Sequence, residues 1–157
     1  MRWSVLDQSP ASEGSGEDAA IRESLALARL CDRLGFHRFW VSEHHNTSSI
    51  VGTAPEILMA AIAAVTARIR IGSAGVMLPH YAALKVAEQF RVLEALAPGR
   101  IDLGVGRAPG SDGRTALVLA DHHARRALRR QRWFGARRQP VVVAAIRSLP
   151  LATKPKH

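Results

Sequence analysis

Apolar and polar positions follow two rhythms along the first 117 residues. Short apolar runs of five or six residues indicate buried strands, and they occur at 2–7, 38–42, 69–74 and 101–105. Longer segments between these runs carry apolar residues at three- and four-residue spacing, as helices do, and they span about 17–34, 55–67 and 81–97. The order βαβαβαβ predicts an α/β fold with a parallel sheet and right-handed crossovers.

The spacing also predicts which side of two helices is buried. On the first helix the apolar face is Leu27, Leu30, Cys31 and Leu34, and on the third it is Val86, Phe90, Leu93 and Ala97. Helix ends are marked by Gly35 and by Pro98-Gly99, and Thr53-Ala54-Pro55-Glu56 reads as a capping box that starts the second helix. Four βα units are half of a (β/α)8 barrel, which typically needs about 250 residues. An open doubly wound sheet is the alternative.

Charge divides the chain in two. Residues 1–117 hold 12 Lys and Arg against 12 Asp and Glu, whereas residues 118–157 hold 10 Lys and Arg against one acid. We therefore expect a half-barrel domain at 1–117 and an irregular basic tail at 118–157, in which 141–146 forms a strand or a short helix. The tail is open to two interpretations. Arginines beside Trp133-Phe134 could bind nucleic acid, but we favour a segment read out of frame and consider nucleic-acid binding unlikely.

The remaining bulk features exclude several classes of protein. Residues 1–7 read as a strand rather than a signal peptide, and no apolar run approaches the ~20 residues of a membrane helix. With Cys31 as the one cysteine, an intramolecular disulfide cannot form, so we expect a cytoplasmic protein without membrane attachment.

The most informative segment is the second predicted strand, which stops abruptly at Glu43-His44-His45-Asn46. A rigid buried strand that ends in polar side chains is typical of a site. Adjacent histidines on a strand point to opposite faces and no HExxH spacing occurs, so we expect no metal. Two interpretations stay open: an imidazole that faces a cavity as acid, base or donor, and a hydrogen-bonded cluster that only fixes the strand end.

Two further strand ends could join this site. The small residues of Gly72-Ser73-Ala74-Gly75 allow a flat ligand or another backbone to approach closely, although plain sheet packing also explains them. Arg107 follows the fourth strand and is placed for a phosphate or carboxylate, or else is a surface arginine paired with an acid. The surrounding GxGxxxG pattern is not a dinucleotide fingerprint, since Pro109 would disrupt a helix that starts there.

Four motifs at the strand ends, in matching order and spacing, resemble the luciferase-like flavin monooxygenases, a (β/α)8 family, and its group 1 oxidoreductase branch in particular. The motifs are Ser4–Pro10, Phe39–Asn46, Ile71–His80 and Pro98–Gly110. The resemblance implies an enzyme that uses reduced FMN, or a deazaflavin in some branches, to oxidise a small organic substrate with O2.

The resemblance also implies roles for individual residues. His44 resembles the catalytic histidine, and Ala74-Gly75 aligns with a non-prolyl cis peptide against the flavin ring, a register one residue later being the alternative. Arg107 resembles the arginine that meets the flavin phosphate. Glu43, His45 and Asn46 are then expected to support His44 or to line the pocket.

The chain departs from the family in its length. Family members run to about twice this length, and the likeness stops near residues 114–117, before barrel strands five to eight. We therefore expect an incomplete half-barrel with an exposed edge. The alternative to a truncated oxidoreductase is a non-catalytic fragment or subunit whose open edge is covered in a homo- or hetero-oligomer.

Overall fold

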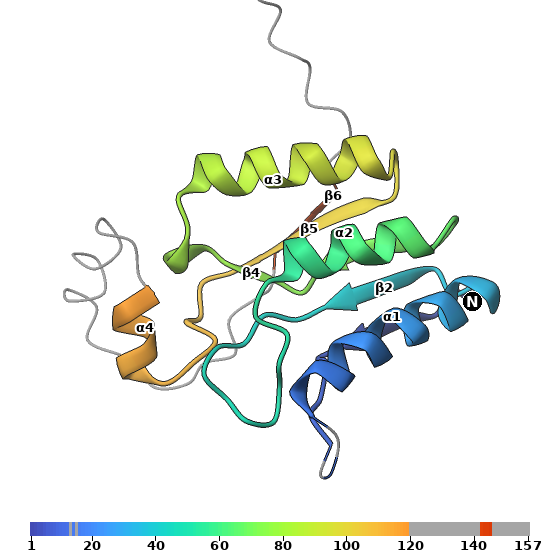
Figure 1. Ribbon diagram of the computed structural model, residues 1–157. Helices are drawn as coiled ribbons and strands as arrows, with labels where there is room; N and C mark the ends of the chain where they lie inside the picture. The colour runs from blue at the N-terminus through green and yellow to red at the C-terminus, as the bar shows by residue number, and fades with distance from the viewer. Residues whose placement is uncertain (13, 15, 120–141, 146–157) are drawn as a thin grey trace, which may run out of the picture.

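The computed structural model describes residues 1–12, 14, 16–119 and 142–145. Strands and helices alternate along the chain (Figure 1), with a short 3-10 helix, η1, before the third long helix. The elements are β1 Ser4–Asp7, α1 Glu17–Arg33, β2 Arg38–Val41, α2 Pro55–Val65, β3 Arg70–Ser73, β4 Val76–Met77, η1 Leu78–His80, α3 Ala83–Leu96, β5 Ile101–Gly106, α4 Gly113–Leu119 and β6 Val142–Ala145.

The strands form one sheet in which the predicted parallel order is confirmed. β1 pairs with β2, β2 with β3, and β3 with β5, all parallel. β4 also pairs parallel with β5. Two residues separate the end of β3 from the start of β4, so β3 and β4 pair with successive parts of β5. β6 pairs antiparallel with β5, which settles the strand-or-helix alternative for this stretch. Of the rest of the predicted tail, residues 118 and 119 end α4, and 120–141 and 146–157 lie outside the described residues.

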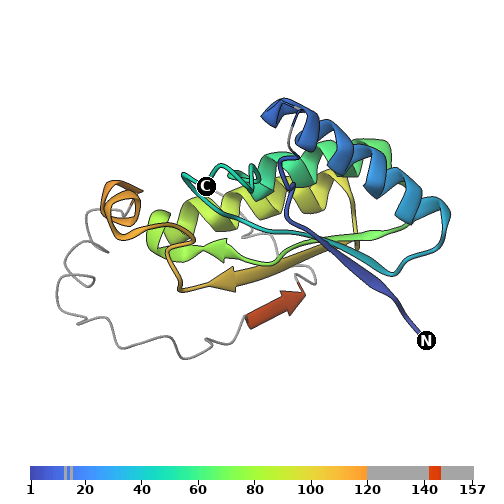
Figure 2. The same ribbon diagram turned by 90° about the horizontal axis from the view of Figure 1, so that it is seen from below.

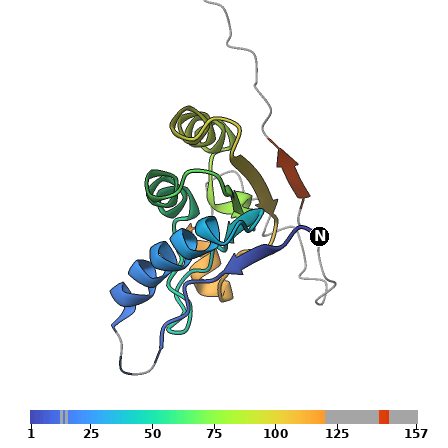
Figure 3. The same ribbon diagram turned by 90° about the vertical axis from the view of Figure 1, so that its right-hand side faces the viewer.

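The three long helices lie on one side of the sheet, and the opposite side carries no described helix (Figures 2 and 3). The core fills the space between sheet and helices. Phe39, Ile71 and Ile101 point into it from the strands, and Met59 and Phe90 meet them from α2 and α3, all without exposed surface. The predicted face of α3 is confirmed, because Val86, Phe90, Leu93 and Ala97 are all buried. This arrangement is part of a barrel wall, with its helices outside.

The predicted buried face of α1 is wrong. Leu27, Leu30 and Leu34 are exposed by 37%, 42% and 65%, and only Cys31 of that set is buried. The buried face is made of small residues, namely Ala20, Ser24, Ala28 and Cys31. Ser24 bonds to Ser9, which follows β1, and to the carbonyl of Ala20 one turn earlier in α1. The leucines therefore lie on the flank of α1.

The helix ends follow the expected signals in part. Gly35 adopts a φ of 77°, and the amides of Gly35 and Phe36 bond back to the carbonyls of Asp32 and Cys31, which is a Schellman motif. The capping box is not formed: Ala54 is the N-cap of α2 without a side-chain cap, while Glu56 accepts a hydrogen bond from Gln89. Pro55 at the first helical position still starts the helix there.

The side of the sheet without helices carries an ion cluster. Asp102, only 1% exposed, bonds to Arg38 at 2.9 Å and to Arg70 at 2.6 Å. Nearby, Trp40 lies so close over Gly72 that a Cβ on that glycine would be 2.3 Å from the indole ring. Burial alone would raise the pKa of Asp102, but the hydrogen bonds of Arg70 and then Arg38 outweigh burial and lower it below its usual value. No helix in the described residues has the length and apolarity to cross a membrane.

Asp102 makes stability depend on acid pH. Its pKa is lower in the folded chain than in the unfolded chain, so its stabilisation is present above its ordinary pKa of 3.8 and is lost as the pH falls below it. The free energy of unfolding, measured in urea from neutral to acid pH, should therefore fall more steeply in the wild type than in Asp102→Asn. Glu88→Gln, which changes an exposed carboxylate, should leave the wild-type dependence intact. Identical acid profiles for wild type and Asp102→Asn would refute this assignment.

β3 and β5 approach each other so closely at Gly104 that any side chain there would clash with the backbone of Ser73. A Cβ there would lie 2.1 Å from the carbonyl oxygen of Ser73, whose hydroxyl also bonds to both backbone groups of Gly104. We expect Gly104→Ala to lower the free energy of unfolding by about 1–3 kcal/mol or more, as overpacking does. Gly113→Ala is the matched control, because nothing lies within 4 Å of its Cβ position. Equal urea midpoints for the two variants would contradict the close approach.

Candidate active site

Because the strands are parallel, the segments that follow β2, β3 and β5 emerge at the same edge of the sheet (Figure 1). Residues 42–46 follow β2, Ala74-Gly75 follows β3, and Arg107 follows β5. The carboxyl edge of a parallel sheet is where α/β folds place ligands. The structure therefore puts the three predicted groups on a common edge.

Glu43 is the centre of this edge. Its side chain has no exposed surface, and its two carboxylate oxygens receive three polar contacts. Oε1 accepts a hydrogen bond from the Tyr81 hydroxyl at 2.9 Å and lies 2.7 Å from His45 Nε2. Oε2 accepts the backbone N–H of Met77 at 2.9 Å. A buried carboxylate is tolerable only when hydrogen-bonded in this way, so Glu43 joins the end of β2 to β4 and to the turn before α3.

Tyr81 is strongly affected by this contact. Burial raises the pKa of its phenol far above the usual value of 10, and the negative charge of Glu43 and the hydrogen bond to it act in the same direction. The hydroxyl is consequently a stable donor to Glu43 at neutral pH.

His45 continues the network toward the loop after β5. Its backbone N–H bonds to the carbonyl of Gly110 at 2.9 Å. The imidazole of His80 stands edge-on to that of His45, with centroids 5.3 Å apart and planes at 87°, and His80 Nε2 bonds to the carbonyl of Pro109. Gly110 adopts a φ of 60° and packs against Glu43 and Met77, so the loop after β5 is held against the end of β2.

Asn46 completes this attachment. It adopts a φ of 51°, and its amide donates to Thr115 Oγ1 at 2.9 Å. Asp112 begins α4 as its cap and accepts hydrogen bonds from the side chain and backbone of Thr115 and from the backbone of Arg114, which lower the pKa of Asp112 to about 2. The role of Asn46 in the structure is therefore to anchor α4.

His44 differs from His45 in having a buried ring nitrogen without a hydrogen-bond partner among the described residues. Its backbone N–H bonds to Gly52, but its Nδ1 is buried and has no hydrogen-bond partner in the described part of the chain. Two more buried atoms at the ends of β1 and β2, Asp7 Oδ2 and Ser42 Oγ, also lack partners there. Buried polar atoms of this kind usually bind a water or a ligand. The two adjacent histidines thus have different environments, although both follow the end of β2 and neither lies on a strand.

The Ala74-Gly75 peptide bond is cis, as the resemblance implied, and the register at Gly75-Val76 is not the one observed. A Cβ on Gly75 would lie 2.8 Å from the backbone of Gly104, so this position accepts only glycine. The small residues after β3 therefore serve close strand packing, whatever else they do. The packing interpretation of this segment and a ligand-binding one are compatible.

Arg107 is exposed, and its guanidinium forms no ion pair with any side chain that the structure describes. The interpretation as a surface arginine paired with an acid is therefore not supported by the described residues. Nothing in the structure brings Arg107 into the Glu43 network.

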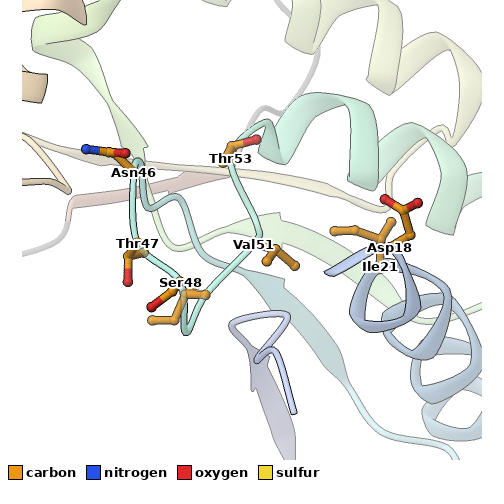
Figure 4. Close-up of a pocket in the computed structure, with 8 residues that line it drawn as sticks. Asp18, Ile21, Asn46, Thr47, Ser48, Val51 and Thr53 are labelled. Atoms are coloured by element: carbon orange, nitrogen blue, oxygen red, sulfur yellow. The ribbon is translucent and has the colours of Figure 1, made fainter. Parts of the chain in front are cut away.

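A cavity of about 530 Å³ lies beside this edge, between the first turn of α1 and the loop 46–53 (Figure 4). Val51 points toward Ile21 of α1, whereas the amide of Asn46 points to the other side, where it meets Thr115. The cavity shares only Asn46 with the predicted site residues, so the predicted site does not lie inside it. In the described residues no group of three or more His, Cys, Asp or Glu is arranged to hold a metal ion.

Sequence reasoning missed several residues of this site. The sequence places Tyr81 at the start of a helix, His80 only at the end of the motif before that helix, and Asp7 and Ser42 at strand ends. The available signal was weak: a lone tyrosine and a histidine directly after the Leu78-Pro79 turn. Their contacts bridge 38 residues between Tyr81 and Glu43 and 29 between His80 and Pro109, distances over which local patterns carry no information.

Comparison with known proteins places this parallel βα sheet and its carboxyl-edge site in a defined family. The family model for luciferase-like monooxygenases matches residues 1–132, and the chain belongs to this family. The match extends beyond residue 117 into residues that the structure does not describe, so the boundary at 117 stays a prediction.

Two curated relatives illustrate the similarity. The chain is 54% identical over 110 residues to an N-acetyl-S-alkylcysteine monooxygenase of Bacillus subtilis, covering 70% of this chain and 33% of that protein. It is 49% identical over 122 residues to a luciferase-like monooxygenase of Escherichia coli, covering 78% of this chain and 36% of that protein. The chain thus spans about a third of the length of the curated relatives it matches.

Solved structures agree on the fold. Apo-MsnO8 superposes with a TM-score of 0.73 at 51% identity, covering 75% of this chain and 36% of that one. The oxygenating constituent of the 3,6-diketocamphane monooxygenase of Pseudomonas putida, solved in complex with FMN, gives 0.62 at 26% identity, covering 69% and 30%. The expected α/β half-barrel within this barrel family is therefore confirmed.

Tyr81 is the only tyrosine, so its ionisation can be followed by ultraviolet absorbance of the intact chain. We expect no tyrosinate to form in the folded protein as the pH passes 10. In Glu43→Gln the pKa of Tyr81 should move back toward 10, although burial keeps it raised in part. Because the folded pKa is raised, the stabilisation from Tyr81 is full below pH 10 and is lost as the pH rises above it. Ionisation of Tyr81 near pH 10 in the folded wild type would contradict the buried contact between Tyr81 and Glu43.

Proposed function

We propose that this chain carries one wall of a flavin site in a monooxygenase that oxidises a small organic substrate with O2. The observation that carries the proposal is the buried Nδ1 of His44 after the carboxyl end of β2, which has no hydrogen-bond partner among the described residues, in a chain of the luciferase-like monooxygenase family. FMN is the cofactor we favour, and a deazaflavin is the alternative. When bound, the reduced cofactor supplies the electrons that activate O2.

The residues of the carboxyl edge fit such a group in three respects. His44 offers a ring nitrogen that needs a partner, and it is suited to hold or move a proton during oxidation. Ala74-Gly75 is a stretch of backbone with little side-chain bulk, beside which a flat ring can lie. Arg107 is an exposed cation without an ion-pair partner in the described residues, which suits the flavin phosphate.

The other predicted residues have supporting roles in this proposal. Glu43 and His45 fix the end of β2, on which His44 lies, and Asn46 holds α4 beside it. The wall is incomplete, since the chain spans about a third of its relatives. A partner or a second copy over the open edge and a cytoplasmic location stay predictions.

Arg107 gives a test that separates phosphate binding from ring binding. Arg107→Ala should weaken FMN binding roughly tenfold, as loss of a charge-assisted contact does, and leave riboflavin binding unchanged because riboflavin has no phosphate. Fluorescence titration of the intact chain with both flavins measures the difference. Arg91→Ala, an exposed arginine on α3, is the control and should bind both like wild type.

Two results would refute parts of the proposal. Equal loss of FMN and riboflavin affinity in Arg107→Ala would remove the phosphate assignment. Absence of FMN binding by the intact chain, together with binding by the same chain extended with the remaining four βα units of a relative, would show that this chain alone does not form the site.

A further inference from the structure

The three partners of Glu43 differ in what they can donate. The Met77 backbone N–H can only donate, and the Tyr81 hydroxyl donates to Oε1 in the observed geometry. An ionised carboxylate only accepts. His45 Nε2, 2.7 Å from Oε1, must then carry the hydrogen of its ring toward Glu43. The donor count therefore decides the tautomer of His45.

We propose that Tyr81 is a positioning residue that acts through Glu43 on His45. Its hydroxyl holds the carboxylate in the orientation that accepts Nε2–H of His45, so that Nδ1 is left as the proton-accepting nitrogen of this ring. Only the use of that nitrogen in oxidation rests on the proposed flavin site; the hydrogen-bond chain itself does not.

The placement of Tyr81 supports this role over plain packing. It lies in the turn between η1 and α3, so its hydroxyl reaches Oε1 from an element other than the one that carries His45. Oε1 is shared by Tyr81 and His45, which couples the two side chains through one atom. Without the hydroxyl, Oε1 keeps His45 as its one partner, and the Met77 N–H on Oε2 is the one remaining donor from another element that orients the carboxylate.

His80 limits the ring of His45 from the other side. A carbonyl only accepts, so His80 must donate Nε2–H to Pro109, and its buried Nδ1 then has no partner in the described residues. The T-shaped contact of the two rings leaves His45 little room to swing toward His80. Once Tyr81 fixes Glu43, the ring of His45 has one orientation that satisfies its contacts.

The imidazole nitrogen NMR shifts of His45 test the proposal, with His45→Gln used for assignment. In wild type we expect one tautomer with the hydrogen on Nε2. Tyr81→Phe keeps the aromatic ring and removes only the hydroxyl, and it should give a mixture of both tautomers. Glu56→Gln is the control: Glu56 acts on Tyr81 through its charge without a hydrogen bond to it, so the tautomer should stay as in wild type.

Each outcome decides the matter. A His45 ring that keeps Nε2–H fully in folded Tyr81→Phe would overturn the proposal and leave Tyr81 a packing residue. Should Tyr81→Phe fail to fold, the wild type still decides, because a His45 ring without a hydrogen on Nε2 at neutral pH would overturn the donor count.

A parallel FMN titration separates the two proposals. A wild type that binds no FMN, with the expected tautomer in wild type and a mixture in Tyr81→Phe, would count against a flavin site formed by this chain alone and support the role of Tyr81. A wild type that binds FMN, with the tautomer of His45 unchanged in Tyr81→Phe, would support the flavin site and overturn the role of Tyr81.

Discussion

The buried carboxylate of Glu43 is the constraint on which the carboxyl edge of the sheet depends. A carboxylate without exposed surface is costly unless donors surround it, and here they come from β4, from the turn before α3 and from the residue two places along its own loop. Those contacts fix three separate segments at once. The loop after β5 then attaches through the backbone of His45 and the ring of His80, and α4 attaches through Asn46.

The sequence predicts the elements well where apolar residues pack under the helices and poorly where an element depends on distant contacts. Strands such as Arg38–Val41 are read correctly because Phe39 and Val41 are buried on the side that the helices cover. α1 is misread, since leucines are the more hydrophobic residues but its buried face is formed by alanines, Ser24 and Cys31. β4, η1 and α4 were missed because each is short and depends on tertiary contacts.

The candidate site follows the same division. That polar side chains after β2 would gather at the carboxyl edge follows from strand direction, and Glu43 and His45 do meet there. Which of the two histidines is paired could not be predicted, because it depends on Tyr81, Met77 and Gly110 from distant segments. Arg107 directly follows β5, as expected, but makes no described contact with the Glu43 network. Its part in flavin binding therefore rests on the proposed function.

The central claim, that Glu43 assembles this edge, can be tested by amide hydrogen exchange. In Glu43→Ala we predict loss of protection at the amides of Met77 and His45, while the amide of Ile71, bonded to the carbonyl of Arg100 at 2.7 Å within the sheet, stays protected. Unchanged protection at Met77 and His45 would contradict the claim. Loss of protection at Ile71 as well would show instead that Glu43 supports the whole fold.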